Sequence, residues 1–465
     1  MNIRLTFTIV AAKFIIKLCR LARWGGTTLP GKVARTLYPD IVKVITKDFM
    51  TIMVTGTNGK TTTTRIIGQM LQENGIGYIT NKSGANLVGG VITTFIDSVD
   101  VWGKCSSSTA LIEIDEAAFN VMSNYLEPDI LVVTNFFRDQ LDRYGELYTT
   151  LKGVKSGIMK SSRTRLILNA DDSLCASLAR DTSRDALFFG MSPQAHEAGN
   201  EAVNTDAMFC LYCKQKYEYT NHIYGHLGGF QCPGCGYSRP DTHITCTAIQ
   251  ELKSSYSLVE FKTVDPAGNE ETVSARINLP GLYNIYNALA AAACGKLLGL
   301  PTESLVKAMG SFECGFGRME TIHTDEKTIK VILVKNPIGF NQVLSFLLTE
   351  EKNMQIAFII NDKYADGTDI SWLWDVDFEK LDEIQDMLDN VYTSGLRAED
   401  MAVRLKYAGV YSDKISIVKG YRELIETGLA RTPRGHSFYI LPTYTAMLDI
   451  RKLLKSKFQL KDFWK

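Results

Sequence analysis

One segment constrains the fold of this chain more than any other: residues 54–62, which read VTGTNGKTT. It follows the short apolar run Thr51–Thr55 and precedes Lys60–Asn74, a stretch compatible with a helix. Glycines between a buried strand and a helix let backbone N–H groups turn toward phosphate oxygens, and the helix N-terminus adds partial positive charge. We therefore predict a strand–loop–helix unit that binds a phosphate group.

The residue types in this loop predict its ligand. Lys60 would reach the terminal phosphates of ATP, and the Thr61 hydroxyl would hold Mg²⁺. An ordinary turn with an incidental lysine is the alternative to this ATP site. The predicted ATP-binding residues of the loop are Gly56, Thr57, Asn58, Gly59, Lys60, Thr61 and Thr62.

Length and pattern predict the domain organisation. With 465 residues, of which 45% are hydrophobic, the chain can bury two or three separate cores. Strand-like and helix-like segments alternate from residue 51, which predicts an α/β fold with a mostly parallel sheet and helices on both faces. A second alternating block predicts a smaller, Rossmann-like α/β domain. We place an N-terminal helical segment at 1–48, an ATP-binding domain at 49–320 and a C-terminal domain at 321–465.

Four of the ten cysteines form two C-x-x-C pairs, Cys210 with Cys213 and Cys232 with Cys235. Two such turns supply four thiolates, which is the ligand set of a tetrahedral zinc site. We predict a zinc ribbon inserted at 207–240, and a structural role for Zn²⁺ because four cysteines leave no open coordination position. The other cysteines are scattered, so a reducing cytoplasm fits better than a disulfide framework.

The charges of the chain are balanced, with 51 basic and 51 acidic side chains. This balance gives no global field that would attract nucleic acid, and we expect no nucleic-acid partner. A non-catalytic, nucleotide-sensing scaffold that binds nucleic acid through the ribbon is the alternative from a different functional class.

The first residues form a candidate amphipathic helix. Residues 5–18 are largely apolar, but Lys13 and Lys17 interrupt them, and Arg20 and Arg23 follow. No apolar run reaches the roughly 18 residues needed to span a bilayer, and no small-residue cleavage site is evident. The helix either packs on the body or on a partner, or lies on the inner face of the membrane.

The loop sequence GTNGKTT resembles the ATP-binding signature of the Mur ligases and folylpolyglutamate synthases. Gln140 and Tyr283 stand where that family usually has histidine. Further segments resemble the family's motifs in the same order along the chain: Glu113 within IEIDE, TNFFRDQLDR at 134–143, NADD at 169–172, GLYNIYNAL at 281–289 and GRME at 317–320.

The resemblance implies a reaction in which ATP turns a carboxylate into an acyl phosphate that an amine then attacks. It implies that Glu113 binds Mg²⁺ and that Arg318 contacts the nucleotide phosphates. Asn284 and Asn287 match the family's helix start at the nucleotide site. Lys155 lies close to the family's carbamylated lysine, but the local match is poor and favours an ordinary helix lysine.

Two differences from ordinary Mur ligases narrow the resemblance to one group within the family. Residues 1–53 are too few for the precursor-binding domain of ordinary Mur ligases, which also lack the cysteine pairs. Both features, together with KNPIG at 335–339 and ADGTDISWLWD at 365–375, resemble the MurT-type synthetase subunits of lipid II isoglutaminyl synthases. That resemblance implies amidation of the α-carboxylate of D-glutamate in the stem peptide of lipid II to D-isoglutamine.

The same resemblance implies a partner. A GatD-type glutaminase subunit would form a heterodimer with this chain and release ammonia from glutamine. Asp369 would reach across and complete the Cys-His pair of that glutaminase. A turn or N-cap aspartate is the alternative for Asp369, and a Mur-type ligase that adds an amino acid is the alternative for the chain.

Overall fold

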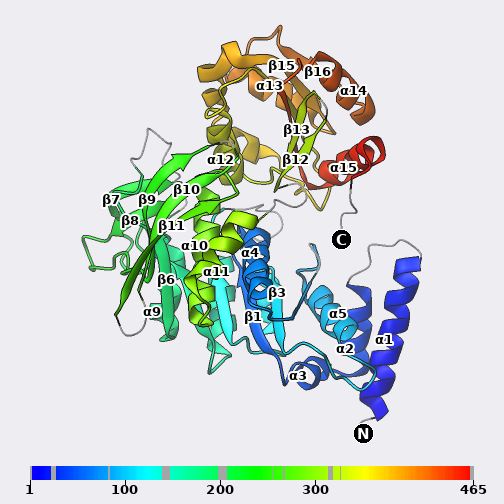
Figure 1. Cartoon of the computed structure of the whole chain (residues 1–465), viewed down its shortest axis with the longest axis vertical. Coiled ribbons are helices and arrows are strands. Elements are labelled where there is room, and N and C mark those ends of the chain that lie inside the picture. Colours follow the sequence, from blue (N-terminus) through cyan, green and yellow to red (C-terminus); the bar gives the residue numbers. More distant parts are fainter. Residues whose placement is uncertain are drawn as a thin grey trace.

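The structure is a computed structural model. It describes residues 3–21, 28–81, 84–138, 147–196, 207–253, 255–264, 268–312, 318–324 and 326–460. Figure 1 shows a large body, a smaller C-terminal lobe on top of it, and the N-terminal helices at one side.

The large body is built on a nine-stranded sheet with the order β11-β10-β9-β6-β5-β4-β1-β3-β2. Along this order, each neighbouring pair from β9 through β6, β5, β4, β1 and β3 to β2 is parallel. The pairs β9–β10 and β10–β11 are antiparallel. Their bounds are β1 Met50–Thr55, β2 Tyr78–Thr80, β3 Thr109–Glu113, β4 Ile130–Val133, β5 Arg165–Asn169, β6 Ala186–Met191, β9 Ile244–Leu252, β10 Ser257–Val264 and β11 Glu270–Ile277.

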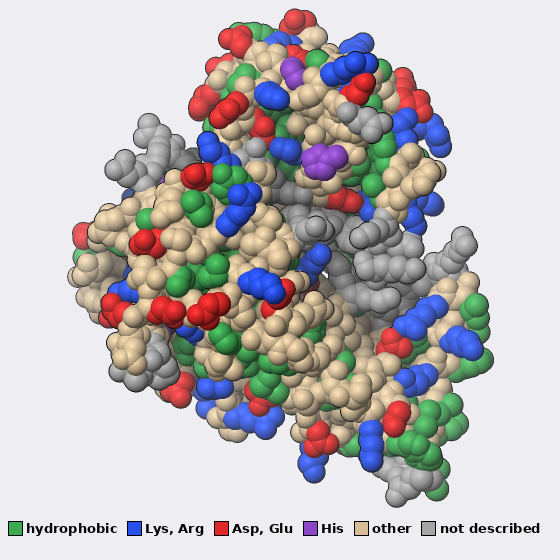
Figure 2. All heavy atoms as spheres, in the orientation of Figure 1, with side chains coloured by type: hydrophobic (Ala, Val, Ile, Leu, Met, Phe, Trp, Pro, Cys, Tyr) green, Lys and Arg blue, Asp and Glu red, His purple; other side chains and the backbone are tan. Residues whose placement is uncertain are grey.

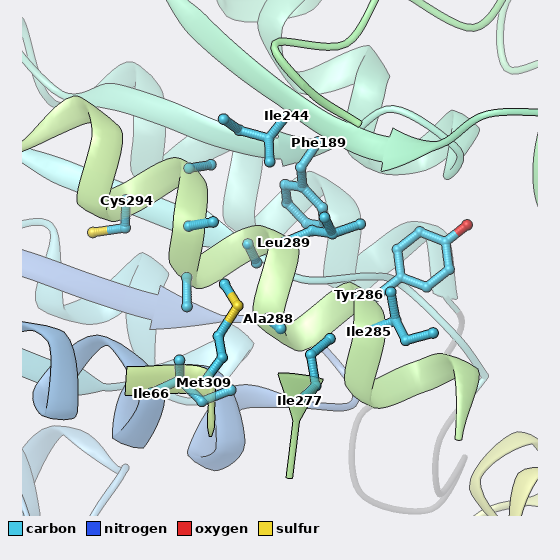
Figure 3. Packing of buried hydrophobic residues seen from close by; sticks show 14 of the residues in the cluster. Ile66, Phe189, Ile244, Ile277, Ile285, Tyr286, Ala288, Leu289, Cys294 and Met309 are labelled. Atoms are coloured by element: carbon cyan, nitrogen blue, oxygen red, sulfur yellow. The ribbon is translucent and has the colours of Figure 1, made fainter. Parts of the chain in front are cut away.

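Both faces of this sheet are covered, which explains why its central strands read as continuous apolar runs. Successive residues of a strand point to opposite faces. Ile52 and Val54 of β1 accordingly belong to one core, and Met53 belongs to the other. The first core contains α4 (Lys60–Glu73), α10 (Leu282–Leu297) and α11 (Thr302–Ser311), and Figure 3 shows α10 packed between its neighbours. The second contains α5 (Val88–Ser98), α6 (Glu116–Met122), α8 (Leu147–Met159) and α9 (Ser173–Thr182).

The C-terminal lobe has a six-stranded sheet with the order β12-β13-β17-β14-β15-β16, parallel except for the β12–β13 pair. The strands are β12 Arg318–His323, β13 Thr328–Ile332, β14 Met354–Ile359, β15 Leu388–Ser394, β16 Ile415–Ile417 and β17 Ser437–Pro442. One face packs on α12 (Pro337–Leu347) and α13 (Ala398–Tyr407), and the other on α14 (Tyr421–Arg431) and α15 (Tyr444–Phe458). The boundary placed at residue 320 from the sequence falls inside β12.

A two-stranded hairpin of β7 (Glu218–Tyr224) and β8 (Leu227–Gln231) lies in the chain between β6 and β9. Its aromatic side chains Tyr217, Phe230 and Tyr237 form a small separate core with Ala176 of α9. This packing fixes the cysteine-bearing segment to the large body.

Three helices precede β1: α1 (Ile3–Leu21), α2 (Leu29–Leu37) and α3 (Ile41–Ile45). Leu5, Ile9, Ala12 and Ile16 of α1 are buried in the same core as α5. Among the helices that the structure describes, none is long and apolar enough to cross a bilayer.

Candidate active site and cysteine cluster

A cavity of about 350 Å³ lies between the two sheets. Parallel α/β sheets bind ligands at the carboxyl ends of their strands, and this cavity is lined from the carboxyl ends of both. The lining residues that follow strands of the large body are Thr57–Lys60, Asp115, Glu116 and Phe137. Those that follow strands of the C-terminal lobe are Leu333, Lys335, Ala365, Asp366, Thr443 and Tyr444.

The predicted phosphate loop connects β1 to α4 at this cavity. Gly59 has a φ of 86°, and a Cβ there would overlap the side-chain oxygen of Asn287, so this position requires glycine. The N–H of Thr57 donates to the carbonyl of Asn135 at 2.9 Å, and the N–H of Asn58 donates to the side-chain oxygen of Asn135 at 2.9 Å. Asn135 therefore holds the loop in shape from the end of the neighbouring strand β4.

Lys60 is buried at the start of α4, where its ammonium group lies 3.2 Å from a carboxylate oxygen of Glu116. It also donates to the backbone carbonyl of Gly56. Burial raises the pKa of Glu116, and the positive charge of Lys60 offsets part of that rise. The loop lysine is thus held in place by a buried carboxylate.

Glu116 is a residue that the sequence reasoning missed, although it belongs to the quoted IEIDE segment. The signal was the acidic pair after β3. Asp115 is the N-cap of α6 and accepts hydrogen bonds from the N–H groups of Ala117 and Ala118. This cap turns Glu116 into the buried interior next to Lys60.

Thr61 and Glu113, the two predicted Mg²⁺ ligands, are brought together. The Thr61 hydroxyl donates to a carboxylate oxygen of Glu113 at 2.5 Å. Asn81 fixes the backbone of Glu113, donating to its carbonyl at 2.8 Å and accepting from its N–H at 2.9 Å. A hydroxyl and a carboxylate are oxygen ligands of the kind that Mg²⁺ takes, so this pair fits the ion.

Asn284 and Asn287 lie in the first turns of α10 and line the cavity beside the loop. The amide of Asn287 donates to the side-chain oxygen of Asn284 at 3.1 Å, and its oxygen accepts from the Thr63 hydroxyl of α4 at 3.4 Å. Arg318 is the first residue of β12, and its side chain lies outside the described part of the chain. Residues 139–143 and 317 of the resembling motifs also lie outside it.

The C-terminal lobe contacts the phosphate loop directly, through residues to which the sequence analysis gave no role. Lys335 donates to the carbonyl of Thr57 at 3.3 Å, and the Asn336 amide donates to the Asn58 side-chain oxygen at 3.1 Å. Asn336 also caps α12, accepting from the N–H of Gly339 at 2.8 Å. The Asn-Pro pair before a helix-like segment was a readable cap signal, but it did not reveal the contact with the loop.

Aromatic side chains form another part of the cavity wall. Phe137 follows β4, and Tyr224 comes from β7 of the cysteine-bearing hairpin. Their rings stack with centroids 5.8 Å apart. Gly225, at the tip of the hairpin, lies close to both Phe137 and Ile338 of α12. The hairpin therefore reaches the cavity and the C-terminal lobe, which its spacing in the sequence did not indicate.

Asp369 is not brought together with Lys60 and Glu113. It is exposed on the C-terminal lobe, where its carboxylate accepts from the N–H and the hydroxyl of Ser371 at 2.8 and 3.0 Å. This is the turn geometry named as the alternative for Asp369. Asp366 is buried instead, and it binds the N–H of Thr445 at 2.7 Å.

The four paired cysteines converge, with all four sulfur atoms within 4.8 Å of one another. Cys213 and Cys232 are 3.3 Å apart, and Cys210 and Cys235 are 3.5 Å apart. Thiolates about 2.3 Å from a tetrahedral ion would lie about 3.8 Å from each other, so the cluster has the size of a metal site. Burial alone would raise the pKa of Cys210, but hydrogen bonds from the backbone of Cys213 and Tyr212 lower it to about 6.

Lys155 lies on α8 and forms an ion pair with Asp181 at 2.9 Å. It is not among the residues that line the cavity. The interpretation of Lys155 as an ordinary helix lysine is consistent with this position.

Comparison with known proteins places the chain in a family. The Mur ligase middle domain matches residues 54–231, and the MurT ligase C-terminal domain matches residues 333–447. A lipid II isoglutaminyl synthase (glutamine-hydrolyzing) subunit MurT from Streptococcus pneumoniae is 35% identical over 461 residues, which cover 98% of each chain. The chain belongs to the MurT family of Mur-type ligases.

A MurT subunit from Staphylococcus aureus (strain COL) is 32% identical, over 96% of this chain and 97% of its own. Solved Mur-type structures have the same fold at low identity. MurF from Acinetobacter baumannii aligns with a TM-score of 0.64 at 18% identity, covering 90% of this chain and 80% of its own. A pseudomurein peptide ligase type C from Methanothermus fervidus aligns with a TM-score of 0.63 at 19% identity, covering 89% of this chain and 81% of its own. The predicted Mur-ligase-like architecture is confirmed.

Proposed function

We propose that this chain is the ATP-dependent synthetase subunit of a lipid II isoglutaminyl synthase. The observation that carries the proposal is its match to MurT subunits over nearly the whole chain, in combination with an intact phosphate loop that faces the cavity. The substrate carboxylate is the α-carboxylate of D-glutamate in the stem peptide of lipid II.

In the proposed reaction, a carboxylate oxygen of the substrate attacks the γ-phosphorus of ATP, which gives an acyl phosphate and ADP. Ammonia then attacks the acyl carbon, phosphate leaves, and the nitrogen loses a proton to give the amide of D-isoglutamine. Activation is needed because a carboxylate is a poor electrophile, whereas phosphate is a good leaving group. ATP and the substrate carboxylate are both anions, and Asp115 and Glu116 already make one side of the cavity acidic. The negative charge of the phosphates must therefore be neutralised there.

The residues of the loop would supply that neutralisation. Lys60 would exchange Glu116 for the phosphate oxygens and stabilise the charge that develops during phosphoryl transfer. Thr61 and Glu113 would hold Mg²⁺, which lowers the charge of the transferring group when bound. Phe137 and Tyr224 are buried and stack on each other, and they would form an apolar part of the wall beside the bound nucleotide.

Ammonia would come from a GatD-type glutaminase subunit that docks on the C-terminal lobe at Asp369. The aspartate is exposed, and Trp374 nearby in the chain is 57% exposed and in edge contact with Tyr407. Exposed tryptophan and tyrosine are the residue types that dominate protein interfaces. In the complex, Asp369 would give up its turn bond and orient the histidine of the partner.

We further propose that the cysteine cluster holds Zn²⁺ in a structural role. Both C-x-x-C turns have the same backbone, with Lys214 and Gly236 donating to the carbonyls of Cys210 and Cys232 and adopting φ values of 64° and 72°. Two equivalent turns that present four thiolates suit one tetrahedral ion. Elemental analysis of the purified chain should give about one zinc per chain, and Cys232→Ser should lose it.

The decisive experiment mixes the chain with its glutaminase partner, lipid II, glutamine and Mg-ATP, and follows product mass and phosphate release. We expect a product lighter by the difference between OH and NH₂, formed only when both subunits are present. A product that gains an amino acid instead would establish the amino-acid ligase. No change in mass with either glutamine or free ammonia would overturn the amidation.

A further inference from the structure

The first helix has an apolar face that nothing in the described structure covers. The exposed side chains of this face recur at helical spacing along α1 and belong to Ile3, Phe7, Val10, Phe14, Leu18 and Leu21. Phe7 is 64% exposed and Phe14 is 61% exposed, which is unusual for phenylalanine. Figure 2 shows hydrophobic side chains gathered at the outer edge of the molecule where Figure 1 places α1. We call these six residues the outer stripe.

A second apolar face of the same helix is already used. Leu5, Ile9, Ala12, Ile16 and Cys19 are buried against the body on the opposite side. At about 100° of rotation per residue, this buried set and the outer stripe lie on opposite sides of the helix axis. The fold of the chain therefore explains one apolar face of α1 and leaves the other to a partner.

The charges of α1 indicate which partner. The helix carries Arg4, Lys13, Lys17 and Arg20 and has no acidic residue. By the same rotation, Lys13, Lys17 and Arg20 run along one border of the outer stripe. Lys13 and Arg20 are anchored on Asp97 at the end of α5, through its carbonyl at 3.1 Å and its carboxylate at 2.5 Å.

We propose that α1 lies on an anionic membrane surface, with the outer stripe among the lipid tails and the basic border at the headgroups. A second copy of the chain is a poorer occupant, because two such helices would bring their basic borders together while the carboxylate of Asp97 is already paired with Arg20. Basic borders beside an apolar stripe match the anionic inner leaflet, where each lysine or arginine near the surface adds attraction. Because α1 does not combine the length and the apolarity needed to cross the bilayer, it would lie in the plane of the interface.

This inference rests on the proposed function in one respect, since membrane docking would bring the cavity close to the lipid-linked substrate. Leu87, which precedes α5, lines the cavity, while Asp97 near the other end of α5 holds α1. An 11-residue helix is about 16 Å long. Docking of α1 would therefore hold the cavity one short helix away from the surface that carries lipid II.

Vesicle binding tests the proposal with the full-length chain, alone and with its glutaminase. Sedimentation with phosphatidylcholine vesicles that contain phosphatidylglycerol should capture the chain, and pure phosphatidylcholine should capture much less. The Phe7→Ser/Phe14→Ser variant should bind at least about tenfold more weakly. The matched control is Leu396→Ser/Val403→Ser, which removes two exposed apolar side chains from the C-terminal lobe and should leave binding unchanged.

Each outcome decides the inference. Equal vesicle binding by both variants, or no binding to anionic vesicles, overturns it. A wild-type dimer that Phe7→Ser/Phe14→Ser abolishes assigns the stripe to a second copy, and loss of glutaminase binding in this variant assigns it to that partner. Amidation of a short-chain, water-soluble lipid II analogue should be unchanged in the variant. Because vesicle capture needs no turnover, failure of the amidation assay in the wild type would sink the proposed function and leave the membrane result readable.

Discussion

The nine-stranded and the six-stranded sheet both direct carboxyl ends of parallel strands at one cavity, but the loops that follow these strands differ in what they offer a ligand. The large body offers a glycine-bearing backbone loop, a buried lysine at Lys60 and the Thr61–Glu113 pair. The C-terminal lobe offers Lys335 and Asn336, which contact the phosphate loop of the large body and do not form a second phosphate loop. In the proposed function, the same architecture would serve phosphate binding on one side and closure over the phosphates on the other.

This difference has a consequence for kinetics. Groups in the large body touch the reacting phosphate in the proposed reaction, so their loss should lower kcat. Groups in the C-terminal lobe position the loop or the partner, so their loss should change KM or the use of glutamine. Substitutions on the two sides of the cavity should therefore have different kinetic signatures.

Replacing Lys60 should separate catalysis from stability. We expect Lys60→Met to lower kcat by about a thousandfold or more, because the charge that stabilises the transferring phosphoryl group is lost. It should also destabilise the fold by about 3 kcal/mol, since Glu116 is left buried without its partner. Steady-state phosphate release and thermal unfolding measure the two effects.

The control for Lys60 is the double variant Lys60→Met/Glu116→Gln. It removes the unpaired carboxylate, so stability should recover while activity stays lost. If activity recovers together with stability, Lys60 has only a structural role and its assignment to the phosphates is wrong.

Replacing Asp369 should affect only the use of glutamine. We expect Asp369→Asn to lower glutamine-dependent amidation by about a hundredfold or more, because the histidine of the partner loses its orienting carboxylate. Amidation with free ammonia should stay within about twofold of wild type. An equal loss with both nitrogen sources would remove Asp369 from the glutaminase site.

Asp366→Asn is the matched control for Asp369, three residues earlier in the same segment. Asp366 is buried and bonded to Thr445, so its loss should lower thermal stability and impair both nitrogen sources alike. The two aspartates should therefore differ in their kinetic effects, although both lie in the same loop after β14.

Replacing Asn336 tests whether the C-terminal lobe closes over the phosphate loop. Asn336→Ala removes both the cap of α12 and the contact with Asn58, and should raise KM for ATP by about tenfold with little change in kcat. Asn336→Ser keeps a capping hydroxyl but is too short to reach Asn58. If the serine variant has a normal KM, the cap alone explains the effect and the contact across the cavity contributes nothing.

Local motifs account for what could be predicted from the sequence. The loop at 54–62, the strand-end Glu113 and the two cysteine pairs each reveal their chemistry within a few neighbouring residues. Thr61 and Glu113 are 52 residues apart, and they meet because the parallel strands β1 and β3 end side by side. The two cysteine pairs also converge as expected. Lys335 and Thr57 are 278 residues apart, and no local pattern encodes their contact. Glu116 was missed for a different reason, because whether an acidic residue is buried beside Lys60 depends on how α6 packs.

Replacing Tyr224 should have the smallest effect, and it is informative because this residue belongs to neither the nine-stranded nor the six-stranded sheet. It lies on the cysteine-bearing hairpin yet stacks on Phe137 in the cavity wall. We expect Tyr224→Ala to raise KM for ATP by about fivefold, because Phe137, whose N–H donates to Thr57 of the phosphate loop, loses the ring packed on it. Tyr224→Phe should stay near wild type because the ring is retained. Removing the proposed Zn²⁺ with a chelator should then mimic Tyr224→Ala before global unfolding, since the hairpin that carries the ring would lose its anchor. A metal-free chain with an unchanged KM would show that the hairpin holds Tyr224 without the ion, and the cluster would then act on stability alone.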